Sequence, residues 1–255
     1  MGGQVVDTES AEEFMRETLE VVSRQDLALV ARLLDAKAAG FASLLAQPGQ
    51  ARALERDDLR RVLRSVFSTR RKADALLDDL GPERLGAAID DLLHGPGVVS
   101  ERFDAFDAVL ARHPEPGFDL PSELLHFTAP DRYWLWTRWM WDPRTGTGAL
   151  PLVTVEDFEL DTGASRGETY VRVGEAIAFV NETGKAVGFT AMGTGLFGAD
   201  VFLACVYAVY MYTVLRLRMT QEFNRIVPEL PDLVRRLLGV YRPPGGPGVS
   251  PEMEV

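Results

Sequence analysis

All four tryptophans of the chain lie in one stretch, Leu124-Leu-His-Phe-Thr-Ala-Pro-Asp-Arg-Tyr-Trp-Leu-Trp-Thr-Arg-Trp-Met-Trp-Asp-Pro143. They are Trp134, Trp136, Trp139 and Trp141. A tryptophan side chain buries a large apolar area, and its indole N–H needs a hydrogen-bond partner when it is buried. So dense a cluster predicts a folding nucleus, a ligand pocket or a docking surface.

The spacing of the tryptophans bears on that choice. If residues 133–141 are helical, Trp134 and Trp141 share one face while Trp136 and Trp139 share another. Such a helix has no wet face, so it must be buried on most sides or half covered by a partner or ligand. Arg132 and Arg138 can stack on the indoles by cation–π contact. We therefore expect these six residues to form an interaction surface, with simple core burial as the alternative.

Composition places the chain among soluble globular proteins. Its 255 residues are 46% hydrophobic and 25% charged, enough for one large domain or two small ones. The net charge of -11 argues against broad binding to phosphate backbones. A single cysteine, Cys205, excludes an intrachain disulfide and a multi-cysteine metal site. The first residues lack a positive region followed by an apolar one, so we expect a cytoplasmic protein.

Apolar residues recur at helical spacing along most of the chain, which predicts a mainly α, multi-helix globular bundle. Ser10 and Glu13 match a capping box at the start of the first helix. A short extended or hairpin segment is expected around 151–162. We predict an N-terminal helical region over 1–117, an aromatic-rich helical region over 118–241 packed on it as one compact unit, and a disordered or partner-bound tail over 242–255.

One long apolar run follows, in which Asp200 is the only charged residue between Ala186 and Leu215. Its strictly apolar part, Val201 to Leu215, spans only about 22 Å as a helix. A bilayer core is roughly 30 Å thick, so we expect a central buried helix, with a transmembrane helix as the alternative. Its tyrosines at 207, 210 and 212 exceed what one core obviously needs, and aromatic residues are enriched at interface centres.

Positive charge is concentrated in one segment. Residues 56–72 hold seven basic and two acidic side chains, the basic ones being Arg56, Arg60, Arg61, Arg64, Arg70, Arg71 and Lys72. Several fall near one helical face, where they can contact phosphates or an acidic partner. The next segment supplies Asp74, Asp78, Asp79, Glu83, Asp90 and Asp91. Internal pairing across a helical hairpin is therefore the favoured interpretation.

The sequence offers no arrangement typical of catalysis. His94, His113 and His126 are far apart and match no metal-binding spacing, so we expect no metal site, and His126 is expected to be a hydrogen-bonded core or helix-end residue. Cys205 lies among apolar residues, which raise the pKa of a thiol, so it should be inert. No Gly-x-Ser-x-Gly or phosphate-binding loop is present. We predict no catalytic residue and no cofactor.

The segment Ser122-Glu-Leu-Leu-His-Phe-Thr-Ala-Pro-Asp-Arg-Tyr133 resembles a motif in helical proteins similar to the helix-hairpin-helix DNA glycosylases. In that motif a Leu-Leu-His-Phe helix end is followed by a Pro-x-x-Tyr turn that leads to an aromatic residue. The resemblance covers about a twentieth of the chain. It implies an all-helical fold and nucleic-acid handling. The glycine-rich hairpin that grips DNA phosphates is missing, as is a catalytic Lys or Asp after it, so the resemblance implies no catalytic role for any residue.

Together these patterns favour a non-catalytic accessory or scaffold protein that binds another protein or a second copy of itself. One alternative is a nucleic-acid-binding or processing module that uses the Arg56–Lys72 segment, which the acidic net charge disfavours. Another is a small-molecule or membrane-linked enzyme subunit with a pocket between Trp134–Trp141 and Ala186–Leu215. A membrane is the least expected partner.

Overall fold

The computed structural model describes residues 5–113, 117–156, 158–160, 163–186, 195–218 and 229–241. These ranges contain ten α-helices and no strand, which confirms the mainly α, multi-helix fold. The helices are α1 (Thr8–Val21), α2 (Arg24–Leu45), α3 (Arg56–Ser65), α4 (Ala73–Leu80), α5 (Pro82–His94), α6 (Val99–Val109), α7 (Asp119–Thr128), α8 (Arg166–Ala186), α9 (Gly198–Arg218) and α10 (Leu230–Leu237). The tail predicted over 242–255 lies outside the described residues.

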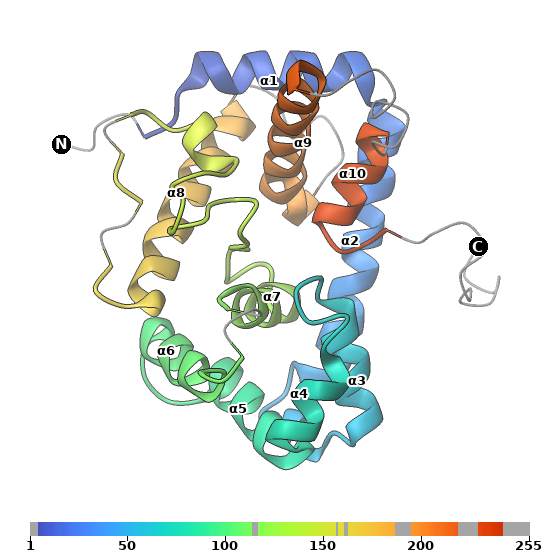
Figure 1. Ribbon diagram of the computed structural model, residues 1–255, viewed down its shortest axis with the longest axis vertical. Coiled ribbons are helices and arrows are strands. Elements are labelled where there is room, and N and C mark those ends of the chain that lie inside the picture. The colour runs from blue at the N-terminus through green and yellow to red at the C-terminus, as the bar shows by residue number, and fades with distance from the viewer. Residues whose placement is uncertain are drawn as a thin grey trace.

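Helix α7 lies at the centre of the molecule. In Figure 1 it is seen end-on, with α1 and α2 along the top and right, α3 to α6 below and α8 on the left. It packs against α2, α5 and α6, and every residue from Asp119 to Phe127 is buried. A helix buried on all sides has no solvated face for its polar side chains, so those of α7 must find partners inside the protein.

The first helical run is broken in two between α1 and α2. Val22 adopts an extended conformation, and the Ser23 side chain accepts from the backbone N–H of Asp26 to cap α2. The predicted cap of α1 is also displaced, since Asp7 rather than Ser10 is the N-cap and accepts from the Ser10 N–H. Short polar side chains at both points compete for backbone donors and so set the helix starts.

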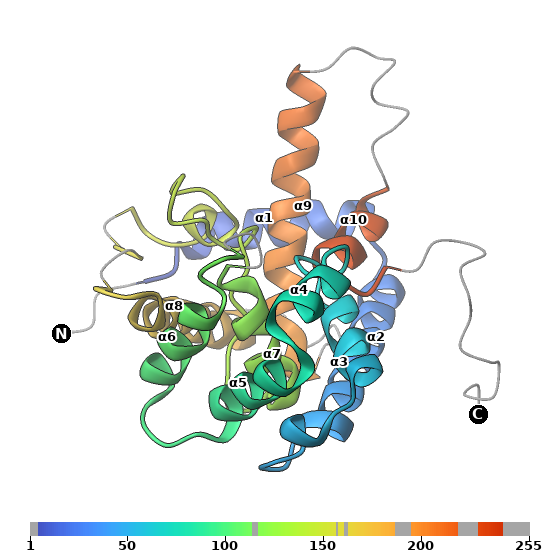
Figure 2. The same ribbon diagram turned by 60° about the horizontal axis from the view of Figure 1, so that its bottom comes forward.

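Helix α9 contains the long apolar run and supplies the core with its first half. It packs against α1, α2, α8 and α10, and its residues from Ala199 to Val206 are buried. Burial ends at Val209, beyond which the helix continues out of the body of the protein (Figure 2). The stretch Gly195–Val214 is long and apolar enough to cross a membrane, although 61% of the apolar window is buried inside the protein, as in the core helix of a soluble protein.

The tryptophan segment is a loop, not a helix. Residues 133–137 have no regular secondary structure and 138–140 form a turn. The region around 151–162 contains a short 3-10 turn at Leu150–Leu152 and one isolated bridge, between Thr154 and Val6, and no hairpin among its described residues.

Candidate functional site

The tryptophan segment is held against one face of α7 by polar side chains of that helix. The Ser122 hydroxyl accepts from the backbone N–H of Trp136 at 2.6 Å. The Asp119 carboxylate accepts from the backbone N–H of Arg138 at 3.1 Å and from its guanidinium at 3.0 and 3.1 Å. His126 Nδ1 donates to the carbonyl of Tyr133 at 2.8 Å. These bonds satisfy backbone groups that a helix would otherwise have paired, which explains why the segment is a loop.

The four tryptophans divide into two buried and two half-buried side chains. Trp136 and Trp141 are 1% and 4% exposed, and the indole N–H of Trp136 donates to the Trp141 carbonyl at 3.0 Å. The ring of Phe118 stacks on Trp136 with centroids 3.9 Å apart. Trp134 lies against Gly174 of α8, and Trp139 donates from its indole N–H to the Leu237 carbonyl of α10 at 3.0 Å. Two of the four tryptophans therefore belong to the core.

The two arginines of the segment contact a tyrosine ring and a carboxylate. Arg132 lies over the Tyr133 ring, 5.4 Å from its centroid, and Arg138 is paired with Asp119. Burial raises the pKa of Asp119 to about 6, in spite of the opposing charge of Arg138. Desolvation thus outweighs the ion pair at this carboxyl.

Two further pairs of charged groups lie inside the protein, and they connect α7 to helices far away in sequence. Lys37 of α2 and Glu123 are 2.7 Å apart and 6% exposed each, and the Lys37 ammonium also lies 3.9 Å from the Phe127 ring centroid. His126 Nε2 and Asp200 Oδ2 of α9 are 3.0 Å apart. Burial lowers the pKa of His126, but the Asp200 carboxylate and the Tyr133 carbonyl raise it, and the net shift is upward.

The sequence did not point to most of these buried polar side chains of α7 and their partners. His126 is a buried, hydrogen-bonded residue as expected, but Lys37 and Glu123 were not singled out. A signal for it exists, because Asp119, Ser122, Glu123 and His126 recur at helical spacing between apolar residues. The four charged side chains of the two pairs are at most 6% exposed, so no substrate can reach them.

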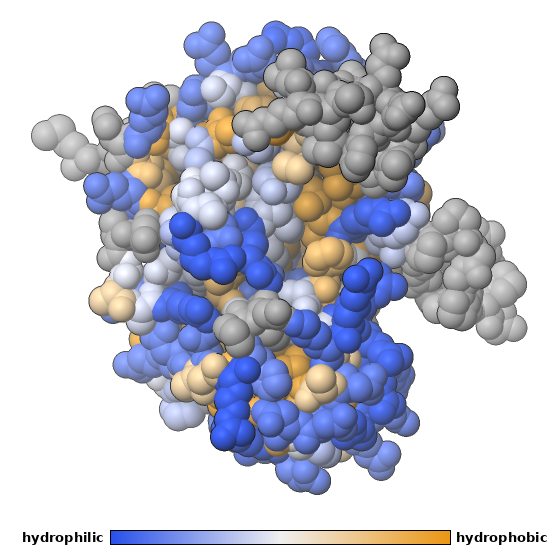
Figure 3. Space-filling model, viewed as in Figure 1, coloured by the Kyte–Doolittle hydropathy of each residue, from blue (hydrophilic) through white to orange (hydrophobic). Residues whose placement is uncertain are grey.

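The basic segment is paired internally over much of its length. Arg60 Nε and Arg64 Nη2 both bind the Asp74 carboxylate of α4, at 2.6 and 3.0 Å. Arg56 pairs with Asp78, and Arg61 with Asp58. The pairs with Asp74 and Asp78 cross the helical hairpin as the charge pattern suggested, whereas Arg61–Asp58 lies within α3. Arg70, Arg71 and Lys72 are exposed beyond the end of α3. In Figure 3, hydrophilic side chains dominate over α3 and α4, while hydrophobic ones gather beside α9 and α10.

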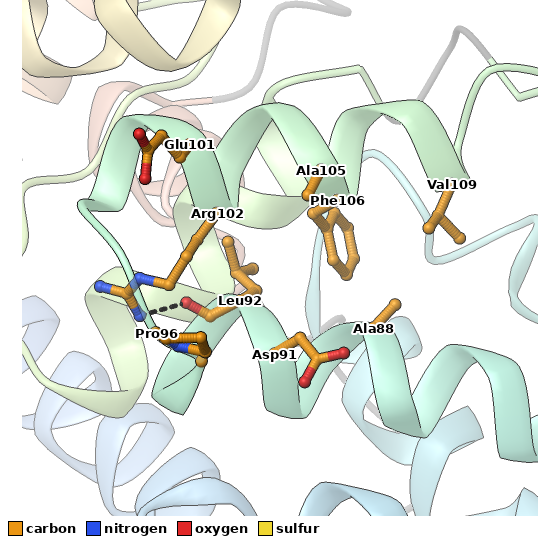
Figure 4. A pocket seen from close by; sticks show the side chains of 10 residues that line it. Ala88, Asp91, Leu92, Pro96, Glu101, Arg102, Ala105, Phe106 and Val109 are labelled. Carbon is orange, nitrogen blue, oxygen red and sulfur yellow. Dashed lines mark hydrogen bonds between the residues drawn. The ribbon is translucent and has the colours of Figure 1, made fainter.

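A cavity of about 280 Å³ opens between α5 and α6 (Figure 4). Its walls are mainly apolar, and Arg102 closes one end by donating to the carbonyls of Leu92 and Leu93 at 2.6 and 2.9 Å. Its other guanidinium nitrogen donates to the Tyr133 hydroxyl at 3.1 Å. The Arg102 guanidinium thus supports the start of the tryptophan segment. The residues that line the cavity include no nucleophile beside a base.

The remaining candidates for reactive chemistry are occupied by structural contacts. His94 Nε2 lies 2.8 Å from the Leu45 carbonyl, and His113 Nε2 lies 2.9 Å from Asp79. Burial raises the pKa of the Cys205 thiol to about 12, so the thiol stays protonated. Within the described ranges, no three His, Cys, Asp or Glu side chains gather as a metal ion would require.

A half-buried surface of apolar and aromatic side chains lies on α9. Tyr207, Tyr210, Met211 and Val214 share one face of the helix by their spacing, and all four are half-buried. We call these four residues the α9 face. The Tyr207 ring is 6.3 Å from Trp139 and 6.3 Å from Tyr210, so aromatic contacts continue from the tryptophan segment onto the face. Burial and the neighbouring Tyr210 raise the pKa of Tyr207.

Comparison with protein-family models, with curated proteins and with solved structures finds no match for the chain. The function must therefore be inferred from the site itself.

Proposed function

We propose that the protein is a non-catalytic accessory or scaffold protein and that another protein docks on the α9 face. The observation that carries the proposal is the course of α9, which leaves the body after Val209 while its sequence stays apolar and aromatic (Figure 2). A helix surface that faces water normally carries charged or polar side chains. Apolar side chains on the half of α9 beyond Val209 favour a partner that covers them.

The aromatic contacts behind the α9 face support docking. Trp139 is fixed by its hydrogen bond to the Leu237 carbonyl, and Tyr207 packs between Trp139 and Tyr210. Aromatic side chains that are already held in place lose little conformational entropy when a partner binds. Such anchored aromatic residues are the ones that contribute most to the affinity of protein interfaces.

The internal charges support a non-catalytic role. The pairs Lys37–Glu123 and His126–Asp200 would be the first candidates for acid–base chemistry, since buried ionisable groups with charged partners are often found at active sites. Their burial denies access to any substrate, and each member already has a charged partner. We therefore assign them to the stability of the fold.

Site-specific photo-cross-linking in the native host tests the proposal. A benzophenone amino acid replaces Tyr210 in one variant and Phe179 of α8 in the control, because Phe179 is 51% exposed but lies off the α9 face. We expect a discrete protein adduct from position 210 and none from position 179. Adducts with lipid alone, no adduct at 210, or the same adducts from both positions would refute docking at the α9 face.

A further inference from the structure

We infer that the protein has a second docking surface, where the turn after α3 meets the end of α10, and that this surface binds an acidic segment of another protein. The surface consists of Phe67, Arg70, Arg71, Arg236 and Tyr241, and we call these five residues the basic patch. It contains no residue of the α9 face, so the inference goes beyond the proposed function and is tested separately. Two separate surfaces are what a scaffold protein needs to hold two other proteins.

The turn between α3 and α4 is fixed to the body of the protein by buried side chains. Val66 and Thr69 are buried, and the Thr69 hydroxyl donates to the Leu63 carbonyl at 2.6 Å. The backbone N–H of Arg70 donates to the Val66 carbonyl at 2.9 Å. Between these anchors, Phe67 is 65% exposed. Because the backbone of the turn is held in place, little conformational entropy is lost from it when a partner binds to its exposed side chains.

The end of α10 lies beside this turn, although the two segments are far apart in sequence (Figure 1, Figure 2). A Cβ atom at Gly239 would lie 3.4 Å from the Ser65 carbonyl oxygen. Gly239 has a φ of 71°, and its N–H donates to the Arg236 carbonyl at 3.1 Å, as in the common glycine ending of an α-helix. The guanidinium of the exposed Arg236 lies over the Tyr241 ring, 3.9 Å from its centroid. Folding therefore adds a third arginine and a second aromatic ring to those of the turn.

The three arginines of the basic patch are exposed and have no carboxylate partner within the ranges that the structure describes. They differ in this respect from the arginines of α3, which pair with aspartates. The rest of the protein is acidic, with a net charge of -11 for the whole chain. An acidic partner is therefore repelled from most of the surface and attracted at the basic patch, which also sets the orientation in which it binds.

The residue types of the basic patch favour a protein segment with carboxylates over other polyanions. Each of its positive charges is an arginine, and a planar guanidinium binds a carboxylate through two parallel hydrogen bonds. Phe67 and Tyr241 add apolar area that the side chains of a protein segment can cover. A nucleic-acid backbone is held by more positive charges, on the order of 6–10 phosphate contacts in strongly salt-dependent complexes. Binding to anionic lipids likewise takes clusters of about 4–8 lysines and arginines.

Fluorescence anisotropy tests this inference on the full-length chain. The probe is a short labelled peptide that has glutamate at two of every three positions and leucine at the third. We expect saturable binding at about 50 mM salt, where charges are weakly screened. Arg70→Glu with Arg71→Glu should raise the dissociation constant by about tenfold or more, and Arg236→Glu alone by about threefold or more. The same peptide with glutamine in place of glutamate should not bind, because it has no carboxylate for the arginines.

A matched charge reversal elsewhere is the control. Arg16→Glu with Arg112→Glu changes the net charge by the same amount, at side chains 70% and 85% exposed on α1 and beyond the end of α6, and should weaken binding much less. Circular dichroism shows whether each variant keeps its helices. No binding of the glutamate peptide by the wild type, or an equal loss in the two double variants, would overturn the inference. Tighter binding to phosphatidylserine vesicles or to single-stranded DNA than to the peptide would overturn the choice of a protein segment.

Discussion

His126 and Asp200 form a charged pair inside the protein, with Nε2 and Oδ2 3.0 Å apart and side chains 1% and 3% exposed. The other ring nitrogen of His126 donates to the Tyr133 carbonyl at 2.8 Å. One imidazole therefore links α7, α9 and the start of the tryptophan segment. Because removing one member would leave the other charge buried without its partner, the fold should be unusually sensitive at this point.

Asp200→Ala should lower the free energy of unfolding by about 3 kcal/mol or more, since it leaves His126 buried without a carboxylate. Urea denaturation near neutral pH measures the loss. Glu182→Ala, which breaks the exposed pair with Lys185, is the control and should change stability little. An Asp200→Ala protein as stable as the wild type would show that the pair contributes nothing.

The His126–Asp200 pair should make stability fall as the pH rises above about 6.5. The pKa of His126 in the folded state lies above its ordinary value of 6.5. Its contribution is therefore complete below about pH 6.5 and is lost as the pH rises through the folded-state pKa. Denaturation curves across this range should show the loss in the wild type and a flatter profile in His126→Gln. Identical profiles would contradict the ion pair.

Asp119 should make the stability of the protein depend on pH in a lower range. Burial raises its pKa from 3.8 to about 6, so the folded protein holds this proton more tightly than the unfolded chain. The contribution of Asp119 to stability then decreases as the pH rises from about 4 to about 6. Asp119→Asn should remove that decrease. Asp142→Asn is the control, because Arg144 lowers the pKa of Asp142 and its contribution has the opposite sign.

The tryptophans should differ in their effect on stability. Trp136→Ala should cost about 3–5 kcal/mol, because it empties a large volume in the core beside Phe118. Trp139→Ala should cost clearly less, since that side chain is half-buried. Urea denaturation of both variants makes the comparison. Equal losses would mean that Trp139 is as much a core residue as Trp136.

The basic segment should not bind nucleic acid in the wild-type protein. Asp57 and Asp74 already pair with Arg60, and Asp74 also pairs with Arg64; the two arginines hold the pKa of the Asp74 carboxyl below its usual value. Fluorescence anisotropy with duplex DNA should detect no binding at about 150 mM salt. Salt-sensitive binding that is lost in Arg60→Glu with Arg64→Glu would contradict this and favour the nucleic-acid alternative.

The sequence was a good guide wherever local periodicity decides the structure. The helical spacing around Leu59, Val62 and Leu63 predicted the buried side of α3, and the apolar run after Asp200 predicted the core part of α9. The Asp side chains that follow the arginines predicted their pairing, because α3 and α4 are neighbours along the chain. The sequence also showed that α9 has more tyrosines than one core needs. It did not show at which residue the burial of α9 would end.

The features that the sequence did not predict were decided by tertiary structure, because they depend on groups that come into contact only after folding. The tryptophan segment is a loop since Asp119, Ser122 and His126 bind its backbone and side chains in place of a helix's own bonds. His126 in turn is paired with Asp200 of α9, and the neighbouring Glu123 with Lys37 of α2, both distant in sequence. By itself the sequence determined which segments are helical and where apolar and charged side chains recur. Only packing decided that two tryptophans fill the core while the second half of α9 is left outside it.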